Sequence, residues 1–153
     1  MEQKEANDGI IAPLPVKFKK VYEDAVLPYY GTEESAGLDC TVYSSEYLKN
    51  SNIVKYYLGF AVEIPKGYVG LIFPRSSVYK CNITMSNCVG VIDSDYRGEV
   101  TAMFYTNLLS NPYKEGERCC QLIIIPYPKI EVIEATELSE TKRGTGGYGS
   151  TGR

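Results

Sequence analysis

One segment of the chain, residues 90–98, places acids, a serine and an aromatic ring between two glycines. It reads Gly-Val-Ile-Asp-Ser-Asp-Tyr-Arg-Gly, so Asp93 and Asp95 bracket a serine just before Tyr96. One Asp is enough to cap a turn, so two Asp residues followed by a tyrosine are more than a turn requires. Because the chain contains no histidine, a carboxylate is the natural general base for activating water. Asp93 is therefore a candidate base, with a solvated turn carboxylate as the alternative.

The last eleven residues, 143–153, form a second segment suited to chemistry. Its five glycines predict a mobile tail, because glycine loses the most conformational freedom on ordering. Backbone N–H groups and hydroxyls in such a segment can wrap phosphate oxygens. Arg143 supplies a forked cation, and Tyr148 supplies a ring that can stack on a flat ligand. The segment is interpreted as a lid over a nucleotide phosphate, with a flexible linker end as the alternative.

Three shorter segments add further capable side chains. They are Ala36-Gly37-Leu38-Asp39, Pro74-Arg75-Ser76-Ser77 and Gly116-Glu117-Arg118-Cys119-Cys120-Gln121. Taken singly, each is as well explained by a turn, a loop or a polar strand edge. Taken together, the acids, arginines, hydroxyls and glycine-rich wrap suit metal-assisted attack of water on a phosphoric anhydride.

Short apolar runs separated by turn residues must position these segments. The Pro65-Lys66-Gly67 sequence predicts a turn between two strands, 62–64 and 68–72. Further strands are expected at 89–92, 99–105, 119–126 and 130–133, with 119–126 buried on both faces. Only 77–82, and more weakly 44–49, have helical character. The pattern predicts an all-β chain, a compact barrel or jelly roll. We divide it into an N-terminal arm (1–15), one barrel domain (16–141) and a C-terminal lid (142–153).

Composition narrows the function classes. The 153 residues are 44% hydrophobic, which suits one domain with its own core. A net charge of −3 without a basic run argues against nucleic acid as the main partner. No apolar stretch of membrane-spanning length and no signal core are visible, so a cytoplasmic or host-cell location and no membrane partner are expected.

The cysteines show no pattern of a disulfide or zinc framework. There are five, at 40, 81, 88, 119 and 120, without a C-x-x-C spacing. Adjacent Cys119 and Cys120 are expected on opposite faces of a strand, and so make a poor pair. Small buried thiols in a reducing compartment are the favoured interpretation.

The five segments, in this order and spacing, resemble the five motifs of the trimeric dUTP pyrophosphatase (dUTPase) family. The resemblance runs from about Val16 to the C-terminus, and residues 90–98 and 143–152 carry it most specifically. It implies a jelly-roll homotrimer with sites at subunit interfaces. It also implies Mg²⁺-assisted hydrolysis of dUTP to dUMP and pyrophosphate, which keeps uracil out of DNA and supplies dUMP for thymidylate synthesis.

The resemblance also implies roles for individual residues. Asp93 is similar to the base that activates the attacking water, and Asp39 to the acid that holds the Mg²⁺ water shell. Asn87 matches the residue that reads uracil, and Tyr96 the ring against the deoxyribose that excludes a 2′-hydroxyl. The substrate contacts implied in all are Arg75, Ser76, Ser77, Asn87, Val91, Tyr96, Gln121, Arg143, Gly146, Gly147, Tyr148, Gly149, Ser150 and Thr151.

Within this set, Ser76 matches the hydroxyl facing the phosphate bridge, and Arg75 the arginine that organises the acidic segment. Gln121 matches the side chain near the α-phosphate, and Arg143 the γ-phosphate arginine. Tyr148 stands where the family usually has a phenylalanine stacked over uracil.

Four positions depart from the family pattern. Ser77 replaces a glycine, Tyr148 a phenylalanine, Cys40 an aliphatic residue, and Leu58 the threonine of a threonine-glycine pair. None of these changes removes a catalytic group. A dCTP deaminase and a non-catalytic regulator that binds a protein partner are the rival functions, and the intact Asp39, Asp93 and Arg143 favour catalysis.

Overall fold

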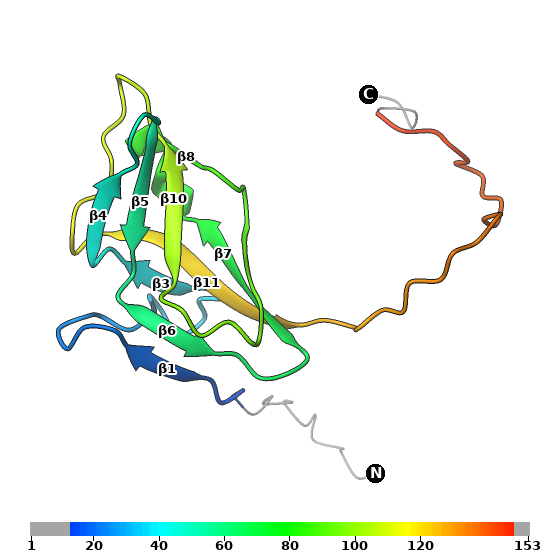
Figure 1. Ribbon diagram of the computed structural model, residues 1–153, viewed down its shortest axis with the longest axis horizontal. Coiled ribbons are helices and arrows are strands. Elements are labelled where there is room, and N and C mark those ends of the chain that lie inside the picture. Colours follow the sequence, from blue (N-terminus) through cyan, green and yellow to red (C-terminus); the bar gives the residue numbers. More distant parts are fainter. Residues whose placement is uncertain (1–12, 149–153) are drawn as a thin grey trace, which may run out of the picture.

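The computed structural model describes residues 13–148 of the chain, and almost all of its regular structure is strand (Figure 1). The one helical element among these residues is a short 3₁₀ helix, η1. In chain order the elements are β1 (Lys17–Lys20), β2 (Tyr29–Tyr30), β3 (Leu38–Thr41), β4 (Ser44–Tyr47), β5 (Ile53–Tyr57), β6 (Phe60–Glu63), β7 (Tyr68–Pro74), η1 (Ser76–Cys81), β8 (Thr84–Met85), β9 (Gly90–Ile92), β10 (Thr101–Tyr105) and β11 (Arg118–Pro126).

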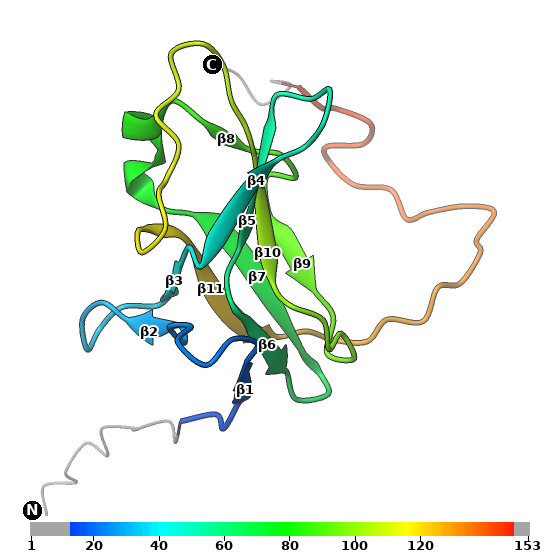
Figure 2. The same cartoon turned by 60° about the vertical axis from the view of Figure 1, so that its left-hand side comes forward.

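The strands form three sheets. Their orders are β1-β6, β4-β5-β10-β8 and β2-β3-β11-β7-β9 (Figures 1 and 2). All the pairings are antiparallel. The expected all-β class is confirmed, although the sheets of the described residues do not close into a single barrel.

One hydrophobic core joins the sheets. Side chains alternate between buried and half-buried along β5 and β10, as the period of two in a strand requires. Tyr56, Phe104 and Tyr113 meet edge to face in this core, with ring centroids 5.6 to 6.3 Å apart. The hydroxyls of Tyr56 and Tyr113 are buried without a hydrogen-bond partner among the described residues. Burial raises the pKa of Tyr113 to about 12.

The turn expected between β6 and β7 is present. The N–H of Tyr68 donates to the carbonyl of Pro65 at 3.1 Å, and Gly67 has a φ of +88°. A positive φ at the third position of such a turn is available to glycine at little cost. The turn passes the chain from the sheet of β6 to the five-stranded sheet.

Two secondary-structure expectations are wrong. Residues 44–47 form a strand paired with β5 rather than part of a helix, because cross-strand pairing overrides the helical propensity of this stretch. Residues 130–133 form no strand, because no neighbouring strand pairs with them in this chain. Strand β11 also departs from the expected burial on both faces, since Ile125 and Pro126 at its end are exposed.

The cysteines follow the expectation in part. Cys40, Cys119 and Cys120 are fully buried, whereas Cys81 is half-buried and Cys88 is exposed. The Sγ atoms of Cys119 and Cys120 lie 3.6 Å apart, because a register shift between Arg118 and Cys120 interrupts the regular alternation of β11. Hydrogen bonding to the Cys119 and Cys40 thiols, together with burial, raises the pKa of Cys120, so this thiol stays protonated and unreactive.

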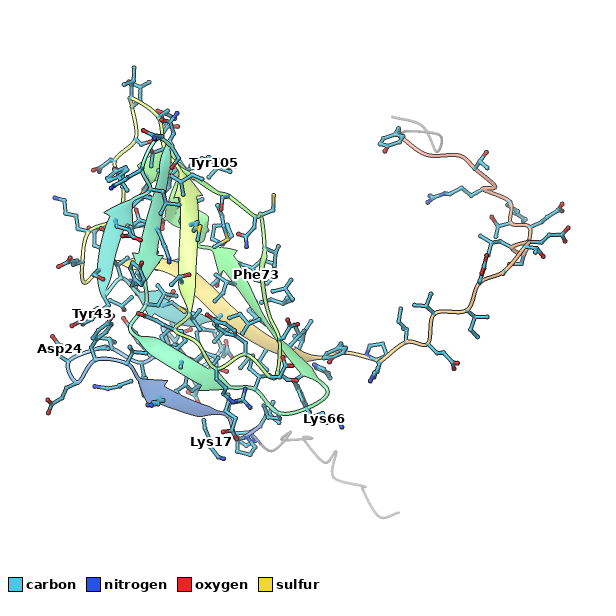
Figure 3. All side chains as sticks on the ribbon, in the orientation of Figure 1. Lys17, Asp24, Tyr43, Lys66, Phe73 and Tyr105 are labelled. Atoms are coloured by element: carbon cyan, nitrogen blue, oxygen red, sulfur yellow. The ribbon has the colours of Figure 1, made fainter. Side chains whose placement is uncertain are left out.

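Beyond β11 the chain leaves the packed body. Residues 127–148 run as an extended segment, and their side chains point into solvent (Figures 1 and 3). The exposed side chains include the apolar Ile130, Val132, Ile133 and Leu138. No helix formed by residues 13–148 is long and apolar enough to cross a membrane.

Candidate functional site

The five-stranded sheet brings three of the five segments together. Asp39 on β3 pairs with Gln121 on β11, and Cys120 pairs with Pro74 at the end of β7. Segments far apart in the sequence therefore meet at one end of this sheet. We call the group formed by Asp39, Arg75, Arg118 and Gln121 the ion-paired cluster.

The Asp39 carboxylate lies between two guanidinium groups. Arg75 Nε donates to Oδ1 at 3.0 Å, and Arg118 Nη1 donates to Oδ2 at 2.8 Å. The Asp39 side chain is only 13% exposed, against 41% for Arg118. Charge-assisted hydrogen bonds of this kind are short and strong. The two arginines therefore hold the carboxylate in one orientation and compensate its charge.

Gln121 is fixed by its backbone surroundings. Its Nε2 donates to the carbonyl of Pro74 at 3.2 Å. A Cβ at position 37 would lie 2.7 Å from Gln121 Oε1, so Gly37 makes room for this amide. Ser76, at the start of η1, is exposed, and Ser77 is half-buried. The end of β7 thus presents hydroxyls beside a fixed amide and a fixed arginine.

A second group forms around β9. A cavity of about 220 Å³ is lined by residues that include Asn87, Val91, Asp93 and Tyr96. All four are predicted site residues, and all four side chains are exposed. We call this group the hairpin pocket.

The loop after Asp93 is closed by its own hydrogen bonds. The N–H of Tyr96 donates to the carbonyl of Asp93 at 3.1 Å, and Arg97 Nη1 donates to the carbonyls of Ser94 and Tyr96 at 2.7 and 2.9 Å. The Tyr96 hydroxyl donates to the carbonyl of Glu99 at 3.1 Å. A Cβ at Gly98 would collide with the Tyr96 ring, so the glycine that ends this segment lets the ring fold back.

The two groups lie apart in one chain. Strand β9 pairs with the early part of β7, with Ile92 opposite Gly70, whereas Arg75 follows the last residue of β7. Ile72 also lines the hairpin pocket, and from Ile72 to Arg75 the chain advances roughly 10 Å at about 3.3 Å per residue. The ion-paired cluster and the hairpin pocket share no lining residue, and we refer to them as two half-sites.

The C-terminal residues of the predicted site do not contact either half-site. Arg143, Gly147 and Tyr148 are exposed and Gly146 is half-buried, in a segment directed away from the body (Figure 1). The N–H of Gly146 donates to the carbonyl of Arg143 at 3.0 Å, which forms a local turn. Gly149, Ser150 and Thr151 lie outside the described residues.

Arg118 is a site residue that the sequence did not single out. It belongs to the 116–121 segment, but no role was assigned to it there. Its contact with Asp39 depends on the pairing of β11 with β3 and on the register shift beside it. The signal available in the sequence was a basic residue three positions before Gln121, preceded by Glu117 and followed by two cysteines.

The described residues contain no ready-made metal centre. No group of three or more Cys, Asp or Glu side chains within residues 13–148 is placed to hold an ion. Asp39 already accepts one hydrogen bond on each oxygen, but each oxygen keeps further acceptor capacity. The arrangement fits an ion held by phosphate oxygens and water with one carboxylate beside it, which is the usual environment of Mg²⁺.

Comparisons with known proteins agree on one family. The family model described as dUTPase matches residues 23–152. A deoxyuridine 5'-triphosphate nucleotidohydrolase from Hydrogenobaculum sp. (strain Y04AAS1) is 43% identical over 138 residues, covering 88% of this chain and 95% of that protein.

Solved structures show the same fold. The dUTPase of Staphylococcus bacteriophage 80alpha with dUPNHPP superposes with a TM-score of 0.76 at 25% identity, covering 91% of this chain and 99% of that one. A D95N mutant dUTPase from phage phi11 of S. aureus, described with a structural Mg(II) ion, gives a TM-score of 0.67 at 22% identity, covering 81% and 98%. With a family match over most of its length and a relative of this identity, the chain belongs to the dUTPase family.

Proposed function

We propose that this protein hydrolyses dUTP to dUMP and pyrophosphate by attack of an Asp93-activated water on the α-phosphorus. The observation that carries the proposal is the convergence of the sequence segments into two half-sites of complementary chemistry. One offers fixed cations, an amide and hydroxyls for phosphates, and the other offers a small cavity with a free carboxylate. Family membership supplies the reaction class.

The hairpin pocket binds the nucleoside in this proposal. Asn87 and Val91 line the cavity where uracil would be read, and Tyr96 packs against the deoxyribose. Tyr96 is held by its hydrogen bond to Glu99 and by the space at Gly98. A 2′-hydroxyl would meet this ring, which gives the site its preference for deoxyribonucleotides. Asp93, exposed at the rim, is positioned to take a proton from water.

The ion-paired cluster binds the triphosphate. Arg75, Ser76, Ser77 and Gln121 face the phosphates, and the polar groups that hold them keep their positions before the substrate arrives. When Mg²⁺ is bound to the phosphates, it neutralises part of their charge. Asp39 would accept a hydrogen bond from a water of that ion, and Arg118 keeps its carboxylate oriented.

The C-terminal segment completes the site as a lid. Arg143 would bind the γ-phosphate and Tyr148 would stack on uracil, with Gly146, Gly147, Gly149, Ser150 and Thr151 around the phosphates. The exposure of Arg143 and Tyr148 in the chain without a ligand is consistent with a segment that acts elsewhere. Closure of such a segment excludes water and completes the catalytic group.

A homotrimer would unite the half-sites. The hairpin pocket and the ion-paired cluster share no residue, which allows different subunits to supply them to one nucleotide. We infer that Asp39, Ser76 and Gln121 of one subunit act with Asp93 of a second and the C-terminal segment of a third. The exposed apolar side chains of residues 127–138 fit a segment that packs against another subunit.

The cellular role follows from the reaction. Removal of dUTP keeps uracil out of DNA, and the product dUMP is the precursor for thymidylate synthesis. Because this nucleotide pool is used where DNA is made, the protein would act in the cytoplasm of a cell, or of a host cell if its source is viral.

A substrate panel tests the proposal. Purified protein with Mg²⁺ is incubated with dUTP, UTP, dCTP and dTTP, and both pyrophosphate and ammonia are measured. Pyrophosphate release from dUTP alone is expected. Ammonia release from dCTP would instead assign a deaminase, and comparable kcat/KM for UTP and dUTP would contradict the role of Tyr96.

A further inference from the structure

Glu99 lines the hairpin pocket, and its carboxylate has no part in the proposed reaction. The residue is half-buried and directly follows Gly98, which makes room for the ring of Tyr96. Its Oε1 accepts the backbone N–H of Gly59 at 2.8 Å, from a residue 40 positions earlier in the chain. One wall of the nucleoside cavity is therefore tied by a side chain to a distant part of the fold.

The N–H of Gly59 depends on this carboxylate. Gly59 lies in the turn that takes the chain from β5 to β6, is buried, and has a φ of +72° (Figure 1). The backbone on both sides of it is paired, because Leu58 donates to the Val100 carbonyl at 3.2 Å and the Val100 N–H donates to Phe60 at 2.9 Å. In the described part of the chain, the acceptor of the N–H between these bonds is Glu99. A buried N–H without an acceptor is strongly unfavourable, so this bond holds the Glu99 side chain in place.

The neighbours of Gly59 offer no replacement for this acceptor. Leu58 stands where the family pattern has a threonine, so no hydroxyl precedes Gly59, and the leucine side chain is fully buried. The turn is also closely packed, since a Cβ at Gly59 would lie 2.7 Å from the Cβ of Ala25. The Glu99 carboxylate is therefore the side-chain acceptor that this turn requires.

The backbone of Glu99 supports the ring of Tyr96. The Tyr96 hydroxyl donates to the Glu99 carbonyl at 3.1 Å. Because the Tyr96 side chain is 46% exposed, packing alone does not fix the ring. Two hydrogen bonds in series thus connect the β5–β6 turn to the ring, one to the carboxylate of Glu99 and one from the Tyr96 hydroxyl to its carbonyl. We call this arrangement the Gly59–Glu99–Tyr96 link.

We propose that Glu99 is a positioning residue that sets the discrimination against a 2′-hydroxyl by fixing the ring of Tyr96 through this link. The proposal rests on the proposed function, in which Tyr96 packs against the deoxyribose. Steric rejection of one added hydroxyl is typically worth about 10² in kcat/KM, and it requires that the rejecting group stay in place. Loss of the anchor lets the ring move away and admits the ribonucleotide. The Glu99 carboxylate is already engaged by Gly59, so it takes no part in the attack on the α-phosphorus.

The relative use of UTP and dUTP by the full-length protein tests this role. Glu99→Ala removes the acceptor of the Gly59 N–H, and the ratio of kcat/KM for UTP to that for dUTP should rise roughly tenfold. The kcat for dUTP should change much less than this ratio. Glu99→Gln keeps an oxygen that accepts the same N–H, and the ratio should stay close to that of the wild-type protein. Tyr96→Phe keeps the ring but removes its bond to Glu99, so the ratio should rise as in Glu99→Ala.

A control variant separates this effect from a general loss of stability. Val54 is buried in the core on β5 and does not line the hairpin pocket. Val54→Ala should lower the melting temperature and leave the ratio of the two kcat/KM values unchanged. An equal rise of the ratio in Val54→Ala and Glu99→Ala would overturn the proposal. An unchanged ratio in Tyr96→Phe would also overturn it, and this variant decides the question if Glu99→Ala does not fold.

Nuclear magnetic resonance of the protein without nucleotide reports the position of the ring directly. The ring signals of Tyr96 are assigned by their loss in Tyr96→Phe, and hydrogen exchange is followed at the Gly59 amide. Glu99→Ala should shift the Tyr96 signals and speed exchange at Gly59, whereas Glu99→Gln and Val54→Ala should leave both close to wild type. Unshifted Tyr96 signals in Glu99→Ala would overturn the link. A wild-type protein that releases no pyrophosphate from dUTP would count against the proposed function, and these spectra would still decide whether Glu99 positions Tyr96.

Discussion

Asp39 in the ion-paired cluster and Asp93 in the hairpin pocket are held in different ways. Asp39 lies on a central strand pair, is largely buried, and accepts hydrogen bonds from two arginines. Asp93 follows the end of an edge strand, is exposed, and forms no ion pair within residues 13–148. The first carboxylate is committed to organising cations, whereas the second keeps its oxygens free for chemistry.

The difference shows which of the two carboxylates contributes to the stability of the fold. Two charge-assisted hydrogen bonds make Asp39 part of the packing that holds β3, β7 and β11 together. Asp93 contributes little to packing, so its presence in the loop is not explained by stability. The Asp93 carboxylate forms no structural contact in the described part of the chain and lies in the same cavity as the ring of Tyr96, so it is suited to catalysis. Substitution of each aspartate should separate the two roles.

Replacement of Asp93 by asparagine should have the largest effect on turnover. Removal of a positioned base typically lowers the rate by about 10²–10⁴, and the amide keeps the shape of the side chain. The kcat for dUTP should therefore fall by at least 10² while binding of dUPNHPP stays nearly the same. The measurement is steady-state pyrophosphate release alongside calorimetric titration. A variant that keeps more than about a tenth of its kcat would show that Asp93 is not the base.

Removal of residues 142–153 tests whether either half-site works without the C-terminal segment. The kcat should fall at least roughly tenfold, because stacking of an aromatic ring on a base is alone worth roughly 1–3 kcal/mol. The melting temperature should stay nearly unchanged, since Lys142 to Thr145 are exposed in a segment that runs away from the body (Figure 1). Tyr148→Ala should reproduce part of the loss and Tyr148→Phe none of it. A large fall in melting temperature would instead assign the segment a structural role.

Replacement of Asp39 by asparagine should lower stability, in addition to removing the carboxylate proposed to hold the Mg²⁺ water shell. The change leaves two guanidinium groups against a neutral amide in a largely buried position, which costs about 2 kcal/mol in free energy of unfolding. Asp93→Asn should change this free energy by less than about 0.5 kcal/mol, because that side chain is exposed and unpaired. Urea denaturation of both variants at one chain concentration provides the comparison. Equal shifts of the two midpoints would remove the distinction between a structural and a free carboxylate.

The sequence indicated the hairpin pocket more completely than the ion-paired cluster. Asn87, Val91, Asp93 and Tyr96 are close together in the chain, so one strand and one turn are enough to bring them to one cavity. The cluster depends on contacts between β3, β7 and β11, and its arginine pair with Asp39 depends on a register shift. Arg118 was missed for this reason, since a local pattern does not reveal which side chain faces a residue 79 positions away.

The wrong expectations have the same physical origin. Residues 130–133 are apolar apart from Glu131, as a short strand often is, but a strand exists only where another strand pairs with it. The stretch expected to be helical, 44–49, contains the helix formers Glu46, Leu48 and Lys49, but its residues 44–47 are paired with β5. Cys119 and Cys120 come together because the strand that carries them is irregular. In each case a non-local partner decided the outcome.

Mixing of two inactive variants gives the smallest effect and the sharpest test of how the half-sites combine. Asp93→Asn chains with complete C-terminal segments are refolded one to one with chains that end at Thr141 and keep Asp93. Random assembly makes about three quarters of closed three-fold rings mixed. In any mixed ring, one of the three sites receives an intact Asp93 from one chain and an intact C-terminal segment from another. Roughly a quarter of all sites should then be active, about fourfold below the wild-type protein.

The arrangement of the two half-sites makes this recovery specific. If Asp93 and the C-terminal segment of a site came from the same chain, every site in a mixed ring would lack one of them, and no activity would return. If the protein were active as a monomer, mixing would again leave only the background of the separate variants. Native mass spectrometry confirms that mixed rings have formed, so that a lack of recovery cannot be attributed to failed exchange. Activity near a quarter of wild type, with mixed rings present, requires that Asp93 of one subunit act together with the C-terminal segment of another.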